Sequence, residues 1–216
     1  FAAFDSDNAY YYLNEIPFAD HGALLDPPTS DVSARCATFL FSIGQRGGEL
    51  ESCLNFLRRE QRPDGSWFGR WGTNYIYGTW SVLAALENVN DPLNQFHVLR
   101  AVTWLKNKQR SDGGWGEGCD TYSDPMKAGE GPASTSFQTA WAMLGLMAAG
   151  QVDSEAVRLG AEFLIRAQEA DGLWKDEYFT APGFPNVFYL KYHGYSKYFP
   201  LWALARYLNL RRKKIV

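Results

Sequence analysis

The chain has 216 residues, of which 46% are apolar, 21% charged and 16% aromatic, and its formal net charge is -3. This composition is typical of a folded globular protein, and the mildly acidic balance gives no reason to expect nucleic-acid binding. The three cysteines, Cys36, Cys53 and Cys119, never form a CxxC pair. They therefore disfavour a disulfide framework or a zinc site and fit a reducing compartment. The sequence contains no run of 18 apolar residues, so it predicts no membrane-spanning helix.

The N-terminal segment opens without Met on "FAAFDSDN", and we expect a fragment whose N-terminal portion is missing. The first helix start that the sequence predicts lies in "SDVSARC", with Ser30 as the N-cap residue. Asp31 and Arg35 are four residues apart, so they would share one face of this helix. Taken alone, this spacing most often marks an ordinary surface ion pair.

A repeated pattern, Gln-x-x-Asp-Gly-x-Trp, occurs three times along the chain. Each Gln follows a helical pattern in which a large aromatic residue and a Leu recur at the same register, so the same helix face would be buried each time. The Gly after Asp is free to adopt a positive φ and end the helix. The Gln and Trp residues of the pattern are Gln61, Trp67, Gln109, Trp115, Gln168 and Trp174.

This motif has a structural explanation. Trp offers a large flat surface and one N–H donor, and a Gln amide can hold backbone groups at the end of a neighbouring helix. We therefore interpret the motif residues as structural clamps between helices and not as catalytic residues. After each turn we expect a loop and a second helix, beginning near Tyr77, Thr135 and Tyr198. Few segments alternate as strands do, so the sequence predicts an all-α protein of helical hairpins that form part of an α/α (α6-α6) barrel.

The remaining signals are weaker. His21, His97 and His193 are scattered and do not suggest a ligand set. The basic C-terminal segment, "RYLNLRRKKIV", could contact anionic lipid, although a solvated tail explains it equally well.

The motif and its surroundings resemble the triterpene cyclases, in which the repeat is called the QW motif. The segments "DNAYYYLNEIPFADHGALLDPPTSDVSARC", "GRWGTNYIYGTW" and "GFPNVFYLKYHGYSKYFPLWALARY" resemble the C-terminal part of the squalene-hopene cyclases, essentially from end to end. The sister family of oxidosqualene cyclases carries Asp-Cys-Thr-Ala-Glu where this chain has "DVSAR". This difference favours the squalene enzymes.

The resemblance implies an architecture and a reaction. Residues 1–216 would be the C-terminal portion of one of two α/α barrel domains, in a monotopic homodimer attached to the bacterial cytoplasmic membrane. The reaction would convert squalene to hopene and hopanol without a metal or an organic cofactor. The family protonates squalene with the middle Asp of an Asp-x-Asp-Asp motif, whereas here Asp5–Asp7 is followed by Asn8. We therefore expect the general acid to lie upstream, and the chain alone to be inactive.

Three residues would support that acid. The position of Arg35 is commonly a His in the family, which hydrogen-bonds the catalytic Asp. A cation there stabilises the conjugate base and so strengthens the acid. By the same resemblance, Asp31 would hold Arg35, and Asp26 would join the network. Because Arg cannot give up a proton, its role would be electrostatic and not a proton relay.

The resemblance also assigns a cavity wall. Aromatic faces stabilise a carbocation without offering a nucleophile, by ~2 kcal/mol or more each when desolvated. Phe184 and Phe188 would act on late cations, and Tyr192 and Tyr195 near the first rings. The other cavity residues would be Trp71 and Tyr77, which would act during initial folding of the substrate, and Phe4, at a position that is often Tyr. For any one of these residues taken alone, core packing is the simpler interpretation.

Two alternatives remain open from the sequence. A protein prenyltransferase β-subunit also uses an α/α barrel, but it requires a zinc site of Asp, Cys and His. A non-catalytic helical-repeat binding module would hold a ligand or partner in an aromatic groove and would fold independently.

Overall fold

The computed structural model describes residues 1–3, 10–16, 25–87, 89 and 91–213. Phe4, Asp5–Asp7, Asn8 and His21 lie outside these residues. Within the described part, seven α-helices and one two-stranded sheet form the fold. The elements are η1 (Tyr11–Glu15), α1 (Ser30–Ser42), α2 (Gly48–Arg59), α3 (Tyr75–Leu86), α4 (Pro92–Asn107), η3 (Cys119–Tyr122), η4 (Pro125–Lys127), α5 (Ser136–Ala148), α6 (Glu155–Ala167), β1 (Ala181–Phe184), β2 (Phe188–Leu190) and α7 (Tyr195–Arg212).

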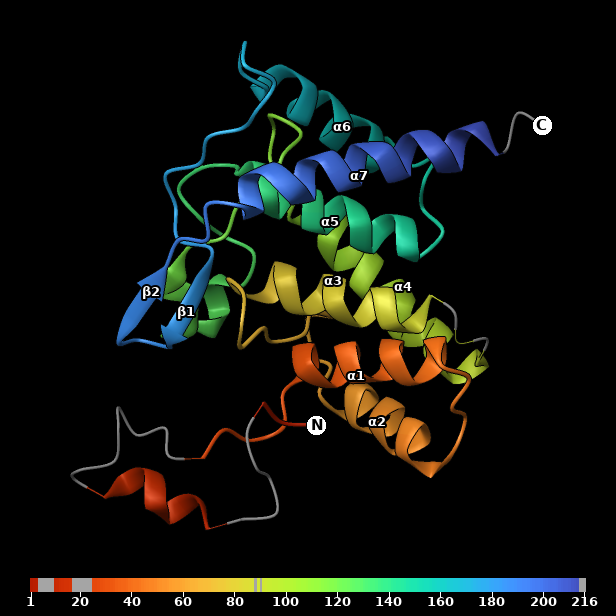
Figure 1. Cartoon of the computed structure of the whole chain (residues 1–216), viewed down its shortest axis with the longest axis vertical. Helices are drawn as coiled ribbons and strands as arrows, with labels where there is room; N and C mark the ends of the chain where they lie inside the picture. The colour runs from red at the N-terminus through yellow and green to blue at the C-terminus, as the bar shows by residue number, and fades with distance from the viewer. Residues whose placement is uncertain (4–9, 17–24, 88, 90, 214–216) are drawn as a thin grey trace.

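The helices form two layers. In one layer α1 packs on α3, α3 on α5, and α5 on α7, while α2, α4 and α6 pack against this layer from outside (Figure 1). The N-terminal ends of α1, α3, α5 and α7 all lie toward the side of the molecule that carries the β1–β2 hairpin (Figure 1). The loops at this end therefore bring together segments that are far apart in the sequence.

The sequence pattern accounts for the middle of the fold and for its cover. α5 is mostly apolar, and every one of its residues is buried. α2 is amphipathic and buries Leu50, Cys53, Leu54 and Leu57, which fall on one face at the i, i+3, i+4, i+7 spacing. The mostly buried helices α3 and α5 therefore lie in the middle of the first layer, and amphipathic helices such as α2 cover it.

The Trp residues of the three motifs occupy equivalent positions. Trp67 Nε1 donates to Leu57 O at 2.7 Å, Trp115 Nε1 to Leu105 O at 2.7 Å, and Trp174 Nε1 to Leu164 O at 2.8 Å. All three acceptors are residues of the helix that precedes the motif. Each indole therefore packs beneath its own outer helix and satisfies a main-chain carbonyl there.

The Gln residues bridge neighbouring repeats. Gln61 Nε2 donates to Gly65 O within its own turn and to His97 O on α4, both at 2.9 Å. Gln109 Nε2 makes the corresponding bonds to Gly113 O at 2.8 Å and to Ala156 O on α6 at 2.9 Å. Gln168 Nε2 donates to Gly172 O at 2.7 Å, and the described residues include no outer helix beyond α7 that would supply a second acceptor.

One expectation from the sequence is wrong: the N-cap residue of α1 is Thr29, whose backbone is extended, and Ser30 is the first helical residue. The fold is mostly helical, in line with the expected helical class, and it also contains one antiparallel hairpin of β1 and β2 that the sequence did not predict. Asn186 adopts a φ of 65° between these strands, a conformation that Asn tolerates better than most residues, and this allows the chain to reverse.

The glycines of the motifs give a test of this packing. Gly65 and Gly113 have φ values of +101° and +88°, and an added Cβ would lie 2.7 Å from the backbone oxygens of Arg100 and Leu159 respectively. We expect Gly65→Ala and Gly113→Ala each to lower the free energy of unfolding by about 2–4 kcal/mol, because conformational strain adds to a clash with the neighbouring helix. Urea denaturation followed by tryptophan fluorescence measures this loss.

Gly172→Ala is the matched control. Its φ is +81°, but an added Cβ would meet nothing within 4 Å. Only the conformational cost remains, about 1–2 kcal/mol. Equal losses at all three positions would show that the repeats do not pack as described.

Candidate functional site

The start of α1 places Asp31 at the centre of the candidate site. This carboxylate is buried and accepts hydrogen bonds from Thr29 Oγ1 at 2.6 Å, Val32 N at 3.0 Å and Trp71 N at 2.7 Å. Both carboxylate oxygens are therefore engaged by other groups. The prediction that Asp31 holds Arg35 is wrong, because Asp31 is bound to the backbone of Trp71, 40 residues along the chain.

Asp26 forms a buried ion pair with Arg70. Its Oδ1 lies 3.2 Å from Arg70 Nε, and both side chains are only 7% exposed. Burial raises the pKa of Asp26, an effect that the positive charge of Arg70 opposes and the negative charge of Asp31 reinforces. The guanidinium of Arg70 lies over the Trp71 ring, 4.3 Å from its centroid, and 5.9 Å from the centroid of Phe184. Asp26 thus belongs to a cluster around Arg70 and not around Arg35.

Arg35 lies on aromatic rings. Its guanidinium carbon is 4.5 Å from the ring centroid of Trp80 and 5.9 Å from that of Tyr77, both on α3. Trp80 is only 1% exposed, whereas Arg35 is itself exposed. The cation is therefore presented at the surface of the described structure, with a buried indole beneath it.

A continuous set of ring contacts extends from Tyr77 across the first layer. Tyr77 meets Trp141 of α5 edge-on at 4.9 Å, Trp141 meets Tyr195 of α7 at 5.9 Å, and Tyr195 lies 5.1 Å from Tyr192. Burial raises the pKa of Tyr195 to about 12 and also raises the pKa of Tyr77. Both phenols therefore stay protonated at neutral pH and present uncharged rings.

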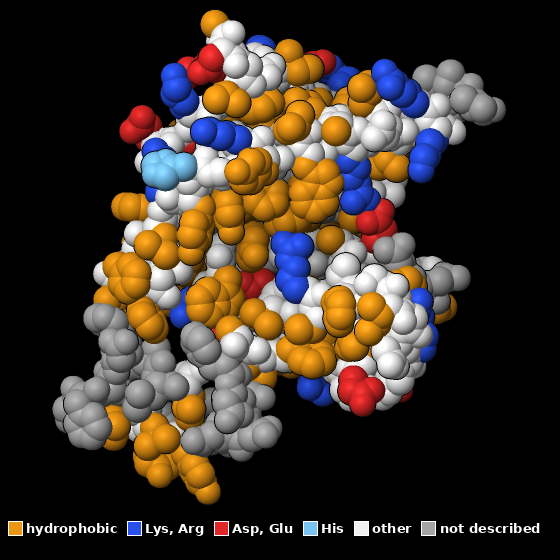
Figure 2. Space-filling view, viewed as in Figure 1, with side chains coloured by type: hydrophobic (Ala, Val, Ile, Leu, Met, Phe, Trp, Pro, Cys, Tyr) orange, Lys and Arg blue, Asp and Glu red, His pale blue; other side chains and the backbone are white. Residues whose placement is uncertain are grey.

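The hairpin carries the remaining predicted aromatic residues. Phe184 on β1 and Phe188 on β2 contact each other at 5.6 Å, and Phe184 lies next to the Arg70 guanidinium. Phe188 and Tyr192 are 41% and 46% exposed. Figure 2 shows hydrophobic side chains gathered over the hairpin, α7 and the region of α3 and α1, which together form one open face.

The predicted aromatic residues thus fall into two groups. In the hairpin cluster, Trp71, Phe184 and Phe188 gather at Arg70, and in the helix cluster Tyr77, Tyr195 and Tyr192 extend from Arg35. Arg70, Trp80 and Trp141 were not predicted from the sequence. The position of Arg70 directly before Trp71 in "GRWG" could have suggested a guanidinium beside this ring. For Trp80 and Trp141, the sequence indicated no role other than core packing.

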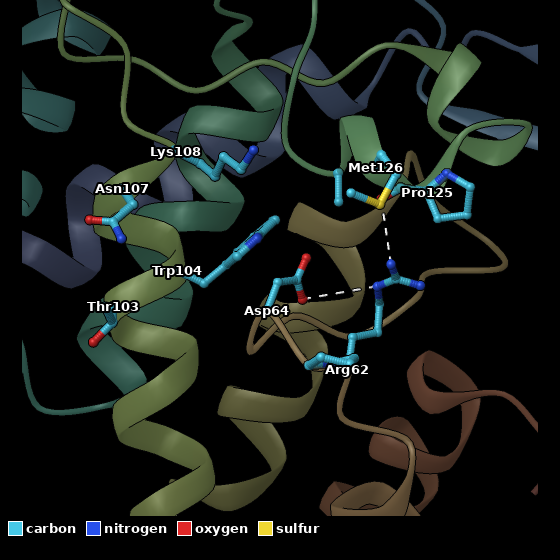
Figure 3. Close-up of a pocket in the computed structure, with 10 residues that line it drawn as sticks. Arg62, Asp64, Thr103, Trp104, Asn107, Lys108, Pro125 and Met126 are labelled. Carbon is cyan, nitrogen blue, oxygen red and sulfur yellow. Dashed lines mark hydrogen bonds and ion pairs between the residues drawn. The ribbon is translucent and has the colours of Figure 1, made fainter.

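A separate pocket of about 480 Å³ lies between the first motif turn, the C-terminal half of α4 and η4 (Figure 3). Arg62 pairs with Asp64 at 3.9 Å on one side, and Trp104 of α4 and Lys108, which directly follows α4, line the other (Figure 3). This pocket contains none of the predicted site residues. The described residues also contain no group of three or more His, Cys, Asp or Glu side chains that could hold a metal ion.

Comparison with known families decides where this chain belongs. Residues 1–209 match the family model described as the squalene-hopene cyclase C-terminal domain. The chain belongs to this family.

Relatives in this family are similar in sequence to this chain along nearly its whole length. The squalene-hopene cyclase of Zymomonas mobilis is 56% identical over 212 residues, which cover 97% of this chain and 32% of that protein. The proteins of the same name from Bradyrhizobium diazoefficiens and Alicyclobacillus acidocaldarius are 54% and 45% identical over 97% and 95% of this chain. This chain thus spans about a third of the length of these relatives.

Solved structures show the same fold at low identity. The ent-copalyl diphosphate synthase of Streptomyces platensis superposes with a TM-score of 0.61 at 21% identity, covering 87% of this chain and 34% of that one. The type II terpene cyclase MstE of Scytonema superposes with a TM-score of 0.55, also at 21% identity, covering 73% and 41% of the two chains. The cyclase-type helical fold of this domain is therefore shared with more distant terpene cyclases.

The buried ion pair of this cyclase domain generates a prediction. Arg70→Met should lower the free energy of unfolding by about 3–5 kcal/mol at neutral pH, because it leaves the Asp26 carboxylate buried without its cation. Burial already raises the pKa of Asp26, and loss of Arg70 raises it further. Between the pKa of Asp26 in the unfolded chain and its higher pKa in the folded variant, the folded variant therefore keeps a proton that the unfolded chain has released. The loss of stability should therefore be smallest near about pH 4 and grow as the pH rises.

Urea denaturation from acid to neutral pH measures this dependence. Arg62→Met is the control, because Arg62 pairs with Asp64 at 3.9 Å in a much more exposed position. Its effect should stay below about 1 kcal/mol and change little with pH. An Arg70→Met loss that does not vary with pH would contradict the assignment of a buried pair.

Proposed function

We propose that this chain forms the C-terminal part of an enzyme that protonates squalene and cyclises it to hopene and hopanol. Family membership and 56% identity to the Zymomonas mobilis cyclase support the reaction class. The observation that carries the proposal is the placement of an exposed guanidinium, Arg35, over Tyr77 and Trp80 of α3, whose ring contacts continue to the aromatic side chains of α7. A cation beside a wall of neutral rings suits a reaction that begins with a strong acid and proceeds through carbocations.

The acid step requires a partner outside the described residues. Squalene has no leaving group, so cyclisation starts when a carboxylic acid protonates a terminal carbon–carbon double bond. Arg35 would face the carboxylate that this proton leaves behind, and its positive charge would lower the pKa of the acid and increase its strength. Because the guanidinium keeps its own proton, the acid would be reprotonated from another source, such as water.

The ring-closing steps use the aromatic wall. Tyr77, Tyr192 and Tyr195 would contact the part of the polyene that closes first, and Phe184 and Phe188 the later cationic centres. The raised pKa values of Tyr77 and Tyr195 support this role, since a phenolate beside a carbocation would capture it. Arg70 would repel the carbocation only weakly, because the carboxylate of Asp26 pairs with it and offsets its positive charge.

The assembly is part of the same proposal. The stacking of helix pairs supports completion of an α/α barrel by the part of the enzyme that the relatives have beyond this chain. We also propose attachment to one face of the cytoplasmic membrane as a homodimer, which would give the enzyme access to a substrate as apolar as squalene. Within the described residues no helix is long and apolar enough to cross a membrane.

A chimaera tests the reaction. This chain would replace the matching residues of the Zymomonas mobilis cyclase, and the product of squalene would be measured by gas chromatography and mass spectrometry. We expect hopene from the chimaera, and a kcat lowered by about ten- to a hundredfold in its Arg35→Met variant, since each unit of acid pKa is worth a factor of ten.

Arg46→Met supplies the control for this prediction. Arg46 also lies on an aromatic ring, 3.6 Å from the centroid of Phe41, but beyond the opposite end of α1. Its replacement should leave kcat within about twofold. A chimaera without cyclase activity, or an Arg35→Met variant that is as active as its parent, would contradict the proposed function.

Phe188 tests the aromatic wall. In the chimaera, Phe188→Leu keeps an apolar side chain but removes the ring, so late cations should lose stabilisation of about 1–2 kcal/mol. We expect products with fewer rings to accumulate beside hopene, while the rate of squalene consumption falls less than the yield of hopene. An unchanged product distribution would place Phe188 outside the cavity.

A further inference from the structure

We propose that Trp80 is a positioning residue that holds the Arg35 guanidinium where the acid needs it, an inference that rests on the proposed function. The indole lies directly beneath the cation, with 4.5 Å between the guanidinium carbon and the ring centroid. Tyr77, the other ring in reach of the guanidinium, is farther away at 5.9 Å. Of the two contacts, the one with Trp80 has the shorter distance and the better π donor.

No described carboxylate performs this task. Asp31, the acidic residue one helical turn before Arg35, is engaged by Thr29, Val32 and the backbone of Trp71. Asp26 is paired with Arg70. Arg35 forms no ion pair with any carboxylate in the described part of the chain, so the groups that orient it there are the face of Trp80 and the side chain of Tyr77, which also hydrogen-bonds Arg35.

The indole of Trp80 is itself rigidly held. It lies parallel to Trp141 at 6.0 Å between ring centroids, with 6° between the planes. Phe199 and Trp202 of α7 meet it edge-on at 5.4 and 5.9 Å. A buried ring fixed on both sides by packing has no alternative position, so the cation above it is restricted as well.

This mode of support has a chemical consequence. A carboxylate partner would orient Arg35 but would also neutralise most of its charge, which would weaken its effect on a neighbouring acid. An aromatic face orients the cation and leaves its net charge intact, together with N–H donors along the edge of the guanidinium. The same surface would suit a planar guanidinium better than the compact ammonium of Lys.

Fluorinated tryptophans test this inference without altering the packing greatly. Fluorine withdraws electron density from the indole and weakens its attraction for a cation, while the ring keeps its shape. Mono-, di-, tri- and tetrafluorotryptophan would be incorporated at position 80 of the chimaera by nonsense suppression, and kcat and KM for squalene measured. We expect kcat to fall stepwise with fluorine number, by about five- to tenfold in total, with KM nearly unchanged.

Two comparisons distinguish positioning from a general effect. The same series at Trp104, a buried tryptophan of α4, should not change kcat. In an Arg35→Met background the series at position 80 should have no further effect on kcat, because the cation that Trp80 holds is gone.

The outcomes separate the two claims. If Arg35→Met lowers kcat but the series at position 80 gives no trend, or the same trend with and without Arg35, then the inference about Trp80 is overturned and the proposed function stands. If Arg35→Met leaves kcat unchanged, the proposed function of Arg35 fails, and the inference fails with it.

Discussion

The binding of motif side chains to main-chain groups is the interaction on which the candidate site depends. Trp67 and Trp115 bind carbonyls of the preceding outer helix through their indole N–H groups, and their own backbone N–H groups donate to Thr79 of α3 and Thr139 of α5. Each of these two motifs therefore ties one outer helix to one helix of the first layer. Because Tyr77, Trp80 and Trp141 project from α3 and α5, the spacing of the aromatic wall follows from these bonds.

The two guanidinium groups beside the aromatic side chains, Arg70 and Arg35, have opposite environments. Arg70 is buried and paired with Asp26, so it joins the segment before α1 to the segment before α3 and lies beside Phe184 of the hairpin without presenting a net charge. Arg35 is exposed and lies on the Trp80 indole, so its charge is available to a partner. Asp31 connects the two regions, since it accepts from Val32 N in the first turn of α1 and from the backbone of Trp71. The site therefore contains one buried, paired cation and one exposed cation.

The sequence predicted the parts of this arrangement that depend on local periodicity. The buried Leu57, Leu105 and Leu164 and the glycines with positive φ follow from helix spacing and turn chemistry, which act over a few residues. The ion pair expected between Asp31 and Arg35 has the correct spacing, but a backbone N–H from a distant loop competes for the carboxylate, and nothing in the local sequence reveals that donor. The Asp26–Arg70 pair joins residues 44 positions apart and was missed for the same reason.

We propose that the open aromatic face lines the cavity in which squalene is cyclised. The most direct test of this proposal is a crystal structure of the chimaera with an azasqualene, an inhibitor in which a protonated amine replaces a carbon of the polyene. The hydrocarbon chain should contact Tyr77, Tyr195 and Phe188, with Arg35 at the end of the ligand where the first double bond would be protonated. A ligand bound elsewhere, with these rings facing solvent or packed against protein, would contradict it.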